Sequence, residues 1–184
     1  MRRTLVGVLS LFLMLGAASE AAGIVSVGVG GFFGRNIPVV QDDASNGSLF
    51  GFKARVQFIP LLGVEPFFTK LDQGDTSVEV WGKEMTRDGG AISVFGLNAI
   101  FGPSSGGLGV NFNLAAGIGS YTISREGVSD ETRFGYNIGP GIEIGFGNGL
   151  ALEVSSRFHM IPLDGGGSRK NVGISGGINY YLGL

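Results

Sequence analysis

The chain has 184 residues, of which 13 are basic and 15 are acidic, so its formal net charge is −2. This length suits one domain, and the charge gives no basic face of the kind that binds nucleic acid. Cysteine is absent, which excludes disulfide bonds, thiolate catalysis and cysteine-ligated metal sites. Glycine accounts for 35 residues, far above the usual ~7 %, and the glycines follow no collagen-like repeat.

The first residues have the features of an export signal. Two arginines precede an apolar run over residues 5–16, and small residues follow up to Ala22. The run is too short for a membrane-spanning helix, which needs ~20 residues. We therefore expect residues 1–22 to be a signal peptide that is cleaved on export, with a retained N-terminal anchor as the alternative. Residues 23–184 are then the mature domain.

The rest of the chain shows the period of two that is typical of β-strands. In the clearest segment, apolar side chains such as Phe52 alternate with glycine or with polar side chains such as Lys53. No later segment has a sustained helical period. The sequence predicts eight strands, which cover residues 24–33, 50–58, 63–71, 91–101, 110–118, 134–146, 150–158 and 172–184.

The connections between these segments alternate in length. Short turns are expected at 60–62, 102–109 and 147–149, and longer polar loops at 34–48, 72–90, 124–131 and 161–171. Short turns at one end and long loops at the other, with both termini at the short end, indicate an all-β, antiparallel up-and-down transmembrane barrel. Residues 77–81 also alternate and could extend the third strand above the membrane.

The orientation of the two strand faces distinguishes a membrane barrel from a soluble one. A soluble lipocalin-like barrel has its apolar face inside, whereas a transmembrane barrel has it outside. Here the polar face carries many glycines, which fit a narrow interior, and charges of both signs, which can pair there. We therefore expect Phe52, Phe58, Phe112, Ile142, Leu152 and Ile178 to point outward, and Lys53, Arg55, Asn113, Glu143 and Glu153 to point inward.

Two prolines within the expected strands conflict with a closed barrel. Pro66 and Pro140 have no backbone N–H to donate to a sheet, and a closed barrel has no free edge on which to place them. Either a bulge accommodates each proline, or a strand boundary is misplaced.

The order of the segments resembles a known family. A signal peptide and eight alternating strands include Leu97-Asn98-Ala99-Ile100-Phe101, a short turn, and then Ala115-Ala116-Gly117-Ile118-Gly119. This order is similar to that of the outer-membrane protein β-barrel family, which includes the OmpA transmembrane domain and OmpX. The resemblance covers essentially the whole mature chain. It implies a monomer in the outer membrane of a Gram-negative-type bacterium, in contact with outer-membrane lipid.

The C-terminal residues carry a second part of the resemblance. Residues 178–184 are similar to the last strand that the barrel-insertion machinery recognises. The chain departs from the family pattern by ending in Leu184 instead of an aromatic residue. The similarity of residues 178–184 to that strand implies that the barrel-insertion machinery is a partner.

The sequence offers little for catalysis or cofactor binding. His159 is the only histidine and would lie ~13 Å from Ser155 along one strand, too far for a nucleophile–base hydrogen bond. Barrel-type lipid A deacylases place His and Ser two residues apart, but the second residue after His159 is Ile161. Acidic pairs such as Asp42-Asp43 lack calcium-loop spacing, and no helix follows the glycine-rich segments. We expect no enzyme, no metal site and no cofactor.

The candidate site is a cluster of charges on the inward face: Lys53, Arg55, Glu65, Glu143, Glu153 and Arg157. The turn at 147–149 sets Glu143 opposite Glu153, and like charges opposite one another destabilise a sheet. We expect Arg55 to lie between these carboxylates, with Lys53 as the alternative, because buried charges persist only when paired. The paired charges would plug an interior just wide enough for side chains. A gated pathway through the same charges is the alternative.

The sequence therefore predicts an outer-membrane barrel with a salt-bridged interior. It would act as a structural or surface-interaction protein through its long loops, whose ligand the sequence does not identify. Two alternatives stay open, namely a narrow channel for small solutes and a soluble periplasmic lipocalin-like barrel. Nucleic acid is not an expected partner.

Overall fold

The computed structural model describes residues 26–39, 45–80, 83–87, 89–103, 107–125 and 127–183. The expected signal peptide at residues 1–22 lies outside the described residues. Within the described part of the chain, no helix is long and apolar enough to cross a membrane.

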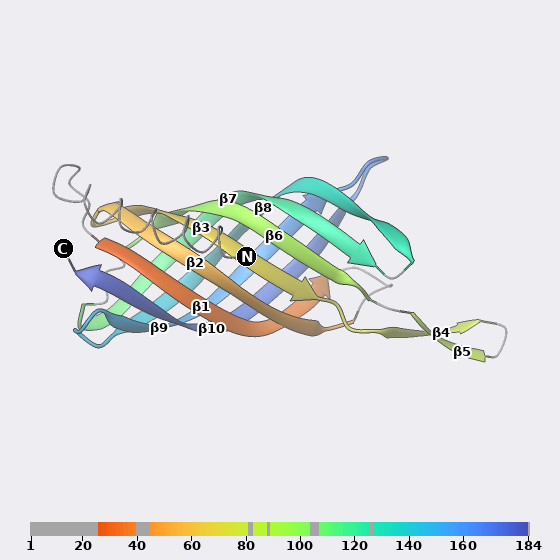
Figure 1. The fold of residues 1–184 in the computed structure, drawn as a ribbon, viewed down its shortest axis with the longest axis horizontal. Helices are drawn as coiled ribbons and strands as arrows, with labels where there is room; N and C mark the ends of the chain where they lie inside the picture. Colours follow the sequence, from red (N-terminus) through yellow and green to blue (C-terminus); the bar gives the residue numbers. More distant parts are fainter. Residues whose placement is uncertain are drawn as a thin grey trace, which may run out of the picture.

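Eight strands form one closed antiparallel barrel (Figure 1). They are β1 (Ser26–Val39), β2 (Gly47–Ile59), β3 (Leu62–Asp72), β6 (Ala91–Phe101), β7 (Gly109–Arg125), β8 (Val128–Gly145), β9 (Leu150–Pro162) and β10 (Ser168–Gly183). Each strand pairs with its neighbour in this order, and β1 pairs with β10 to close the barrel. The predicted eight-stranded up-and-down fold is therefore confirmed.

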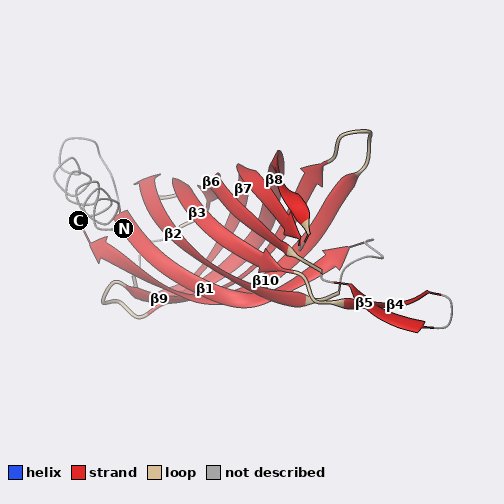
Figure 2. Ribbon diagram, turned by 45° about the vertical axis from the view of Figure 1, so that its right-hand side comes forward, coloured by secondary structure: helices blue, strands red, loops and turns tan. Residues whose placement is uncertain are grey.

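The barrel has two different ends. We call the end that holds the connections β2–β3, β6–β7 and β8–β9 the turn end, and the opposite end the loop end. The described chain starts in β1 and finishes in β10 at the turn end (Figure 1). At the loop end, β4 (Thr76–Val80) and β5 (Lys83–Arg87) pair with each other as a separate two-stranded sheet. This hairpin projects away from the barrel (Figure 2).

The loop end differs from the sequence prediction. Residues 77–81 do not extend the third strand, because residues 76–80 pair with β5 instead, and Trp81 lies outside the described residues. The expected loop at 124–131 is also mostly strand, since β7 continues to Arg125 and β8 begins at Val128. There the backbone ladder continues although the exterior face has become polar, as in the Thr122–Thr132 pair. The alternation of apolar and polar residues therefore underestimates how far the strands continue beyond the apolar exterior.

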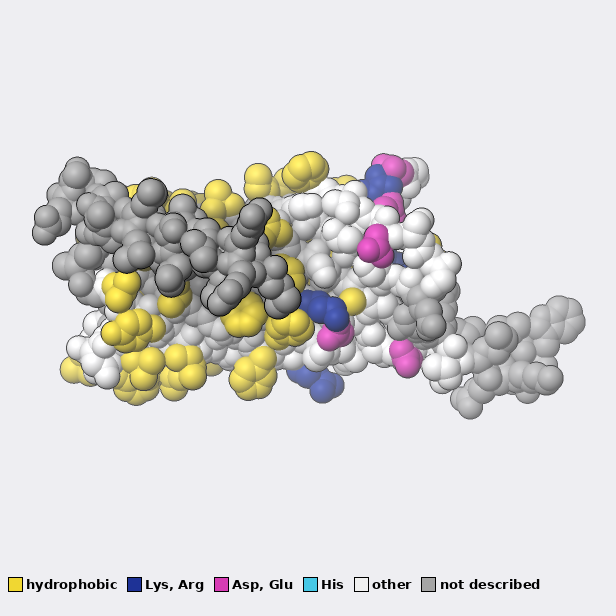
Figure 3. Space-filling view, in the orientation of Figure 1, with side chains coloured by type: hydrophobic (Ala, Val, Ile, Leu, Met, Phe, Trp, Pro, Cys, Tyr) yellow, Lys and Arg dark blue, Asp and Glu magenta, His cyan; other side chains and the backbone are white. Residues whose placement is uncertain are grey.

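The two strand faces have the predicted orientation. The six side chains expected to point outward are between 42 % and 67 % exposed. Arg55, Asn113, Glu143 and Glu153 are buried in the interior, and the side chain of Lys53 is also largely enclosed. Hydrophobic side chains gather on the outer surface of the barrel (Figure 3). This orientation is opposite to that of a soluble ligand-binding barrel.

Interior aromatic rings explain part of the glycine content. Several rings lie directly over a glycine on the neighbouring strand, and a Cβ on that glycine would come within 2.4–2.7 Å of the ring. The pairs are Phe32 over Gly51, Phe67 over Gly96, Tyr121 over Gly135, and Tyr181 over Gly28. Because eight converging strands leave little room, these rings fit only where the facing position has no side chain.

Neither predicted solution for the prolines is right. The β2–β3 ladder lacks pairs beside Pro66, yet Lys53↔Phe67 and Val56↔Val64 keep one register across the gap. The β8–β9 ladder is interrupted in the same way beside Pro140. Each proline therefore removes ladder pairing locally, without a bulge or a shifted strand boundary at that point.

Candidate functional site in the barrel interior

The first layer of the interior is a cluster of buried charges near the turn end. Glu143 of β8 lies directly opposite Glu153 of β9. Arg55 of β2 approaches both: its Nη1 lies 3.4 Å from Glu143 Oε2, and its Nη2 lies 3.2 Å from Glu153 Oε2. Arg55 also forms an ion pair with Glu65 of β3 through two guanidinium nitrogens. One cation thus joins three carboxylates from three strands.

Lys53 is the second cation of this layer. Its Nζ lies 2.6 Å from Glu153 Oε2 and 3.7 Å from Glu65 Oε2. Both of the cations proposed from the sequence therefore contact Glu153, so Lys53 adds to Arg55 and does not replace it. We call Lys53, Arg55, Glu65, Glu143 and Glu153 the ionic layer.

Neutral side chains complete the ionic layer. Tyr181 donates its hydroxyl proton to Glu143 over 2.5 Å, and Asn179 Nδ2 donates to Glu143 over 2.9 Å and to Glu153 over 2.7 Å. Asn98 Nδ2 donates to Glu65 Oε1 over 3.0 Å. These three residues were not predicted from the sequence. Their inward position in the alternation of β6 and β10 was the available signal.

Arg157, the sixth predicted residue, has a different role. Its Nη1 lies 2.9–3.0 Å from the carbonyl oxygens of Gly139, Pro140 and Ser156. Glu153 is more distant, at 4.0 Å from its Nη2. Pro140 cannot donate a backbone hydrogen bond, and the guanidinium fills this break in the β8–β9 ladder. Arg157 is therefore mainly a partner for backbone carbonyls at the edge of the ionic layer.

The second layer of the interior is apolar and lies toward the loop end. Its members are all buried, and several stand at or next to the last residues of their strands. This apolar layer consists of Leu49, Phe67, Leu71, Ile92, Val94, Tyr121, Ile123 and Ile161, with Phe32 packed against it. This layer was not predicted from the sequence, because the inward face was expected to be polar throughout. The signal was present in β6, where Ile92 and Val94 make the inward face apolar as well.

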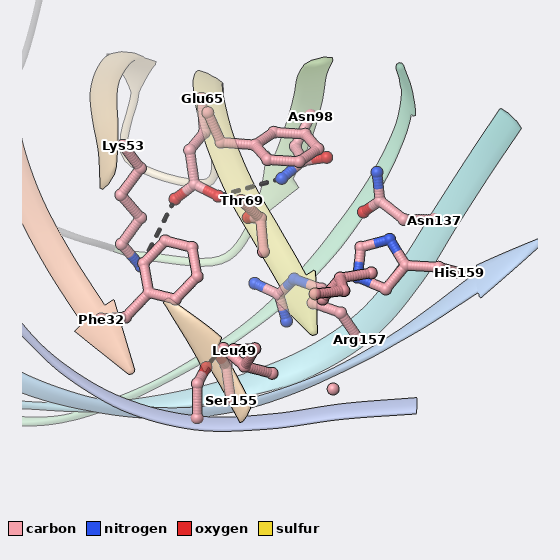
Figure 4. Close-up of a pocket in the computed structure, with 14 residues that line it drawn as sticks. Phe32, Leu49, Lys53, Glu65, Thr69, Asn98, Asn137, Ser155, Arg157 and His159 are labelled. Carbon is pink, nitrogen blue, oxygen red and sulfur yellow. Dashed lines mark hydrogen bonds and ion pairs between the residues drawn. The ribbon is translucent and has the colours of Figure 1, made fainter. Parts of the chain in front are cut away.

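A cavity of about 40 Å³ lies between the two layers. Lys53 and Glu65 stand on one side, and Asn137, Arg157 and His159 on the other (Figure 4). Asn137 is 4 % exposed, and among the described residues neither its Oδ1 nor its Nδ2 has a hydrogen-bond partner. A polar space of this size holds roughly two or three water molecules, which would satisfy this amide.

The arrangement of His159 does not match a hydrolytic site. His159 Nδ1 lies 3.0 Å from the hydroxyl of Tyr121, and the two rings meet edge to face. Ser155 Oγ is hydrogen-bonded to Ser175 Oγ instead, over 3.1 Å. The serine and the histidine are therefore engaged by different partners, and both line the cavity.

Solved structures share the fold. The N-terminal β-barrel domain of Pseudomonas aeruginosa OprF aligns with a TM-score of 0.60 at 14 % identity, over 86 % of this chain and 98 % of that chain. Neisserial surface protein A aligns with a TM-score of 0.61 at 15 % identity, over 86 % and 96 %. OprG from Pseudomonas aeruginosa gives a TM-score of 0.52 at 12 % identity, over 86 % and 96 %.

The family comparison covers most of the chain. No curated protein matches the sequence. The family model described as "Outer membrane protein beta-barrel domain" matches residues 4–181. Together with the closed eight-stranded barrel and its apolar exterior, this match shows that the chain belongs to the outer membrane protein β-barrel family.

Proposed function

We propose that this protein is a closed barrel that acts as a structural or surface-interaction protein of the outer membrane and does not conduct solutes. The observation that carries the proposal is the filling of the interior by two successive layers, one ionic and one apolar. A solute crossing the barrel would have to separate the buried ion pairs and also displace the buried side chains of the apolar layer.

The ionic layer favours closure because its opening is costly. Removing one partner from a buried ion pair leaves an uncompensated charge, which costs about 3–5 kcal/mol. Eight strands also leave an interior that side chains can fill completely. The apolar layer adds a dry constriction, since Leu71, Ile92 and Ile161 are fully buried within it.

Conductance in planar bilayers tests the proposal. We expect the purified protein to give no single-channel currents. The pair Ile92→Ala, Ile161→Ala should open only the apolar layer, and Lys53→Ala with Glu153→Ala only the ionic layer. If the two layers close the barrel in series, neither pair conducts alone, and only their combination does. Defined currents through the parent protein would instead support the narrow channel.

The loop end supplies the surfaces for interaction. Residues 128–132 at the start of β8 are all exposed, and the β4–β5 hairpin projects beyond the barrel (Figure 2). We place this end outside the cell, because outer-membrane barrels have short periplasmic turns. The chain has no cysteine, so single cysteines can test the topology. Ser77→Cys should react with an impermeant maleimide on intact cells, and Asn148→Cys only after the membrane is permeabilised.

Export by a cleaved signal peptide is part of the same proposal. The composition of residues 1–22 supports it. Intact mass measurement of the protein from outer-membrane fractions should give a mature chain that starts near Gly23. A full-length mass would favour the retained anchor.

A further inference from the structure

The outer surface of the barrel carries cations at the edge of its apolar area on one side. On β1 the exposed Phe33 is followed, two residues later on the same face, by the exposed Arg35. On β3 the exterior Phe68 is followed in the same way by Lys70. Figure 3 shows Lys and Arg side chains where the hydrophobic area ends toward the loop end. The next exterior residue, Ile37, is only partly exposed, so Phe33 is the last exposed apolar side chain of β1 before Arg35.

The cations are confined to one side of the barrel. β2 lies between β1 and β3, and its exterior Ser48 stands opposite Arg35 in the ladder. On the strands across the barrel, the exterior residue two positions beyond Phe95, Ile118 or Phe134 toward the loop end is uncharged: Ser93 on β6, Ser120 on β7 and Thr132 on β8. We call Arg35, Ser48 and Lys70 the basic arc.

One acidic residue modifies the basic arc. Asp72 of β3 accepts a hydrogen bond from Ser48 Oγ over 2.8 Å, and its Oδ1 lies 3.3 Å from Lys70 Nζ. These contacts orient Ser48 and Lys70 on the outer surface. Among the described residues, no acidic side chain forms an ion pair with Arg35.

We propose that the basic arc binds the phosphate of a phosphorylated lipid, with lipid A of the outer leaflet as the occupant. Arg35 and Lys70 sit at the level where the apolar exterior ends, which is where lipid headgroups lie. A guanidinium there can hold a phosphate in a bidentate manner. The acyl chains would lie along the exposed rings of Phe33, Phe50 and Phe68. This inference rests on the proposed placement of the loop end outside the cell, but not on whether the interior conducts.

Native mass spectrometry of the protein released from detergent micelles tests this site. The probes are bisphosphorylated lipid A, monophosphoryl lipid A and phosphatidylcholine. We expect the fraction of protein that retains bound lipid to fall in that order. Arg35→Ala and Lys70→Ala should each weaken the binding of bisphosphorylated lipid A about five-fold, because a cation near an anionic headgroup contributes on the order of 1 kcal/mol. Asp72→Asn should strengthen the binding, because it removes the competing charge.

Arg133→Ala is the matched control. It removes the same charge, but Arg133 lies on β8, across the barrel from the basic arc. There it forms ion pairs with Glu131 and Asp164. The control should bind lipid A as the parent does, and the conservative Arg35→Lys and Lys70→Arg should retain most of the affinity. Heat-modifiable migration on gels establishes that each variant is folded. Equal retention by the folded Arg35→Ala, Lys70→Ala double variant and the parent would overturn the proposal.

Discussion

Glu143 and Glu153 lie directly opposite each other on neighbouring strands, both buried inside the barrel. Two carboxylates in this position repel each other, and the ionic layer compensates them in two ways. Arg55 lies within 3.4 Å of Glu143 and 3.2 Å of Glu153. Asn179 donates a hydrogen bond to each carboxylate. The stability of the barrel should therefore depend strongly on this pair.

Replacement of Arg55 by Ala should lower the free energy of unfolding by about 3–5 kcal/mol, because it leaves buried carboxylates without their common cation. The double variant Arg55→Ala, Glu143→Gln should recover part of the loss. Arg55→Ala with Glu153→Gln should recover less, since Lys53 stays beside Glu153. Urea titration in micelles, followed by the gel shift between folded and unfolded protein, measures all three. Strictly additive losses would show that Arg55 and Glu143 are not coupled.

Replacement of Leu152 by Arg should lower the free energy of unfolding by about 2–4 kcal/mol, because the side chain faces lipid. Thr132→Arg is the control, since Thr132 is also exposed but lies two residues beyond Phe134 toward the loop end of β8. It should change stability by no more than about 0.5 kcal/mol. Unfolding from lipid vesicles measures the difference. Equal stability of the two variants would place the apolar face away from the membrane.

Arg157→Ala should destabilise the barrel by about 1–3 kcal/mol, because it leaves three backbone carbonyls without their donor. Pro140→Ala restores a backbone N–H beside this break, so the Arg157→Ala, Pro140→Ala double variant should be more stable than Arg157→Ala alone. A double-mutant cycle on the free energy of unfolding detects this coupling. If Pro140→Ala has the same effect with and without Arg157, the guanidinium does not compensate for the proline.

Gly51→Ala should destabilise the barrel by about 1–3 kcal/mol through overpacking. Its Cβ would lie 2.3 Å from the carbonyl oxygen of Phe68 and 2.4 Å from the ring of Phe32. Gly176→Ala is the matched control, because its Cβ would meet no atom within 4 Å, and it should be nearly neutral. The same urea titration compares them. Equal effects of the two substitutions would contradict the role of interior glycines as space for aromatic rings.

The sequence by itself determined the fold, which face of each strand points outward, and the pairing of the central charges. A period of two assigns Phe52 and Lys53 to opposite faces without knowledge of any neighbour. The short turn at 147–149 sets the register of the hairpin, so it also places Glu143 opposite Glu153. Both inferences are local, since they depend on the geometry of one strand or one turn.

Only the tertiary structure decided what fills the rest of the interior. The apolar layer joins residues from different strands, such as Leu71 and Ile161, and single-strand patterns carry no information on which strands meet across a barrel. The same is true of Arg157, whose partners are backbone carbonyls at the break in the ladder beside Pro140. Strand length at the loop end was also underestimated, because backbone hydrogen bonds continue there after the apolar exterior has ended. These features depend on closure, which brings together residues that are distant in sequence.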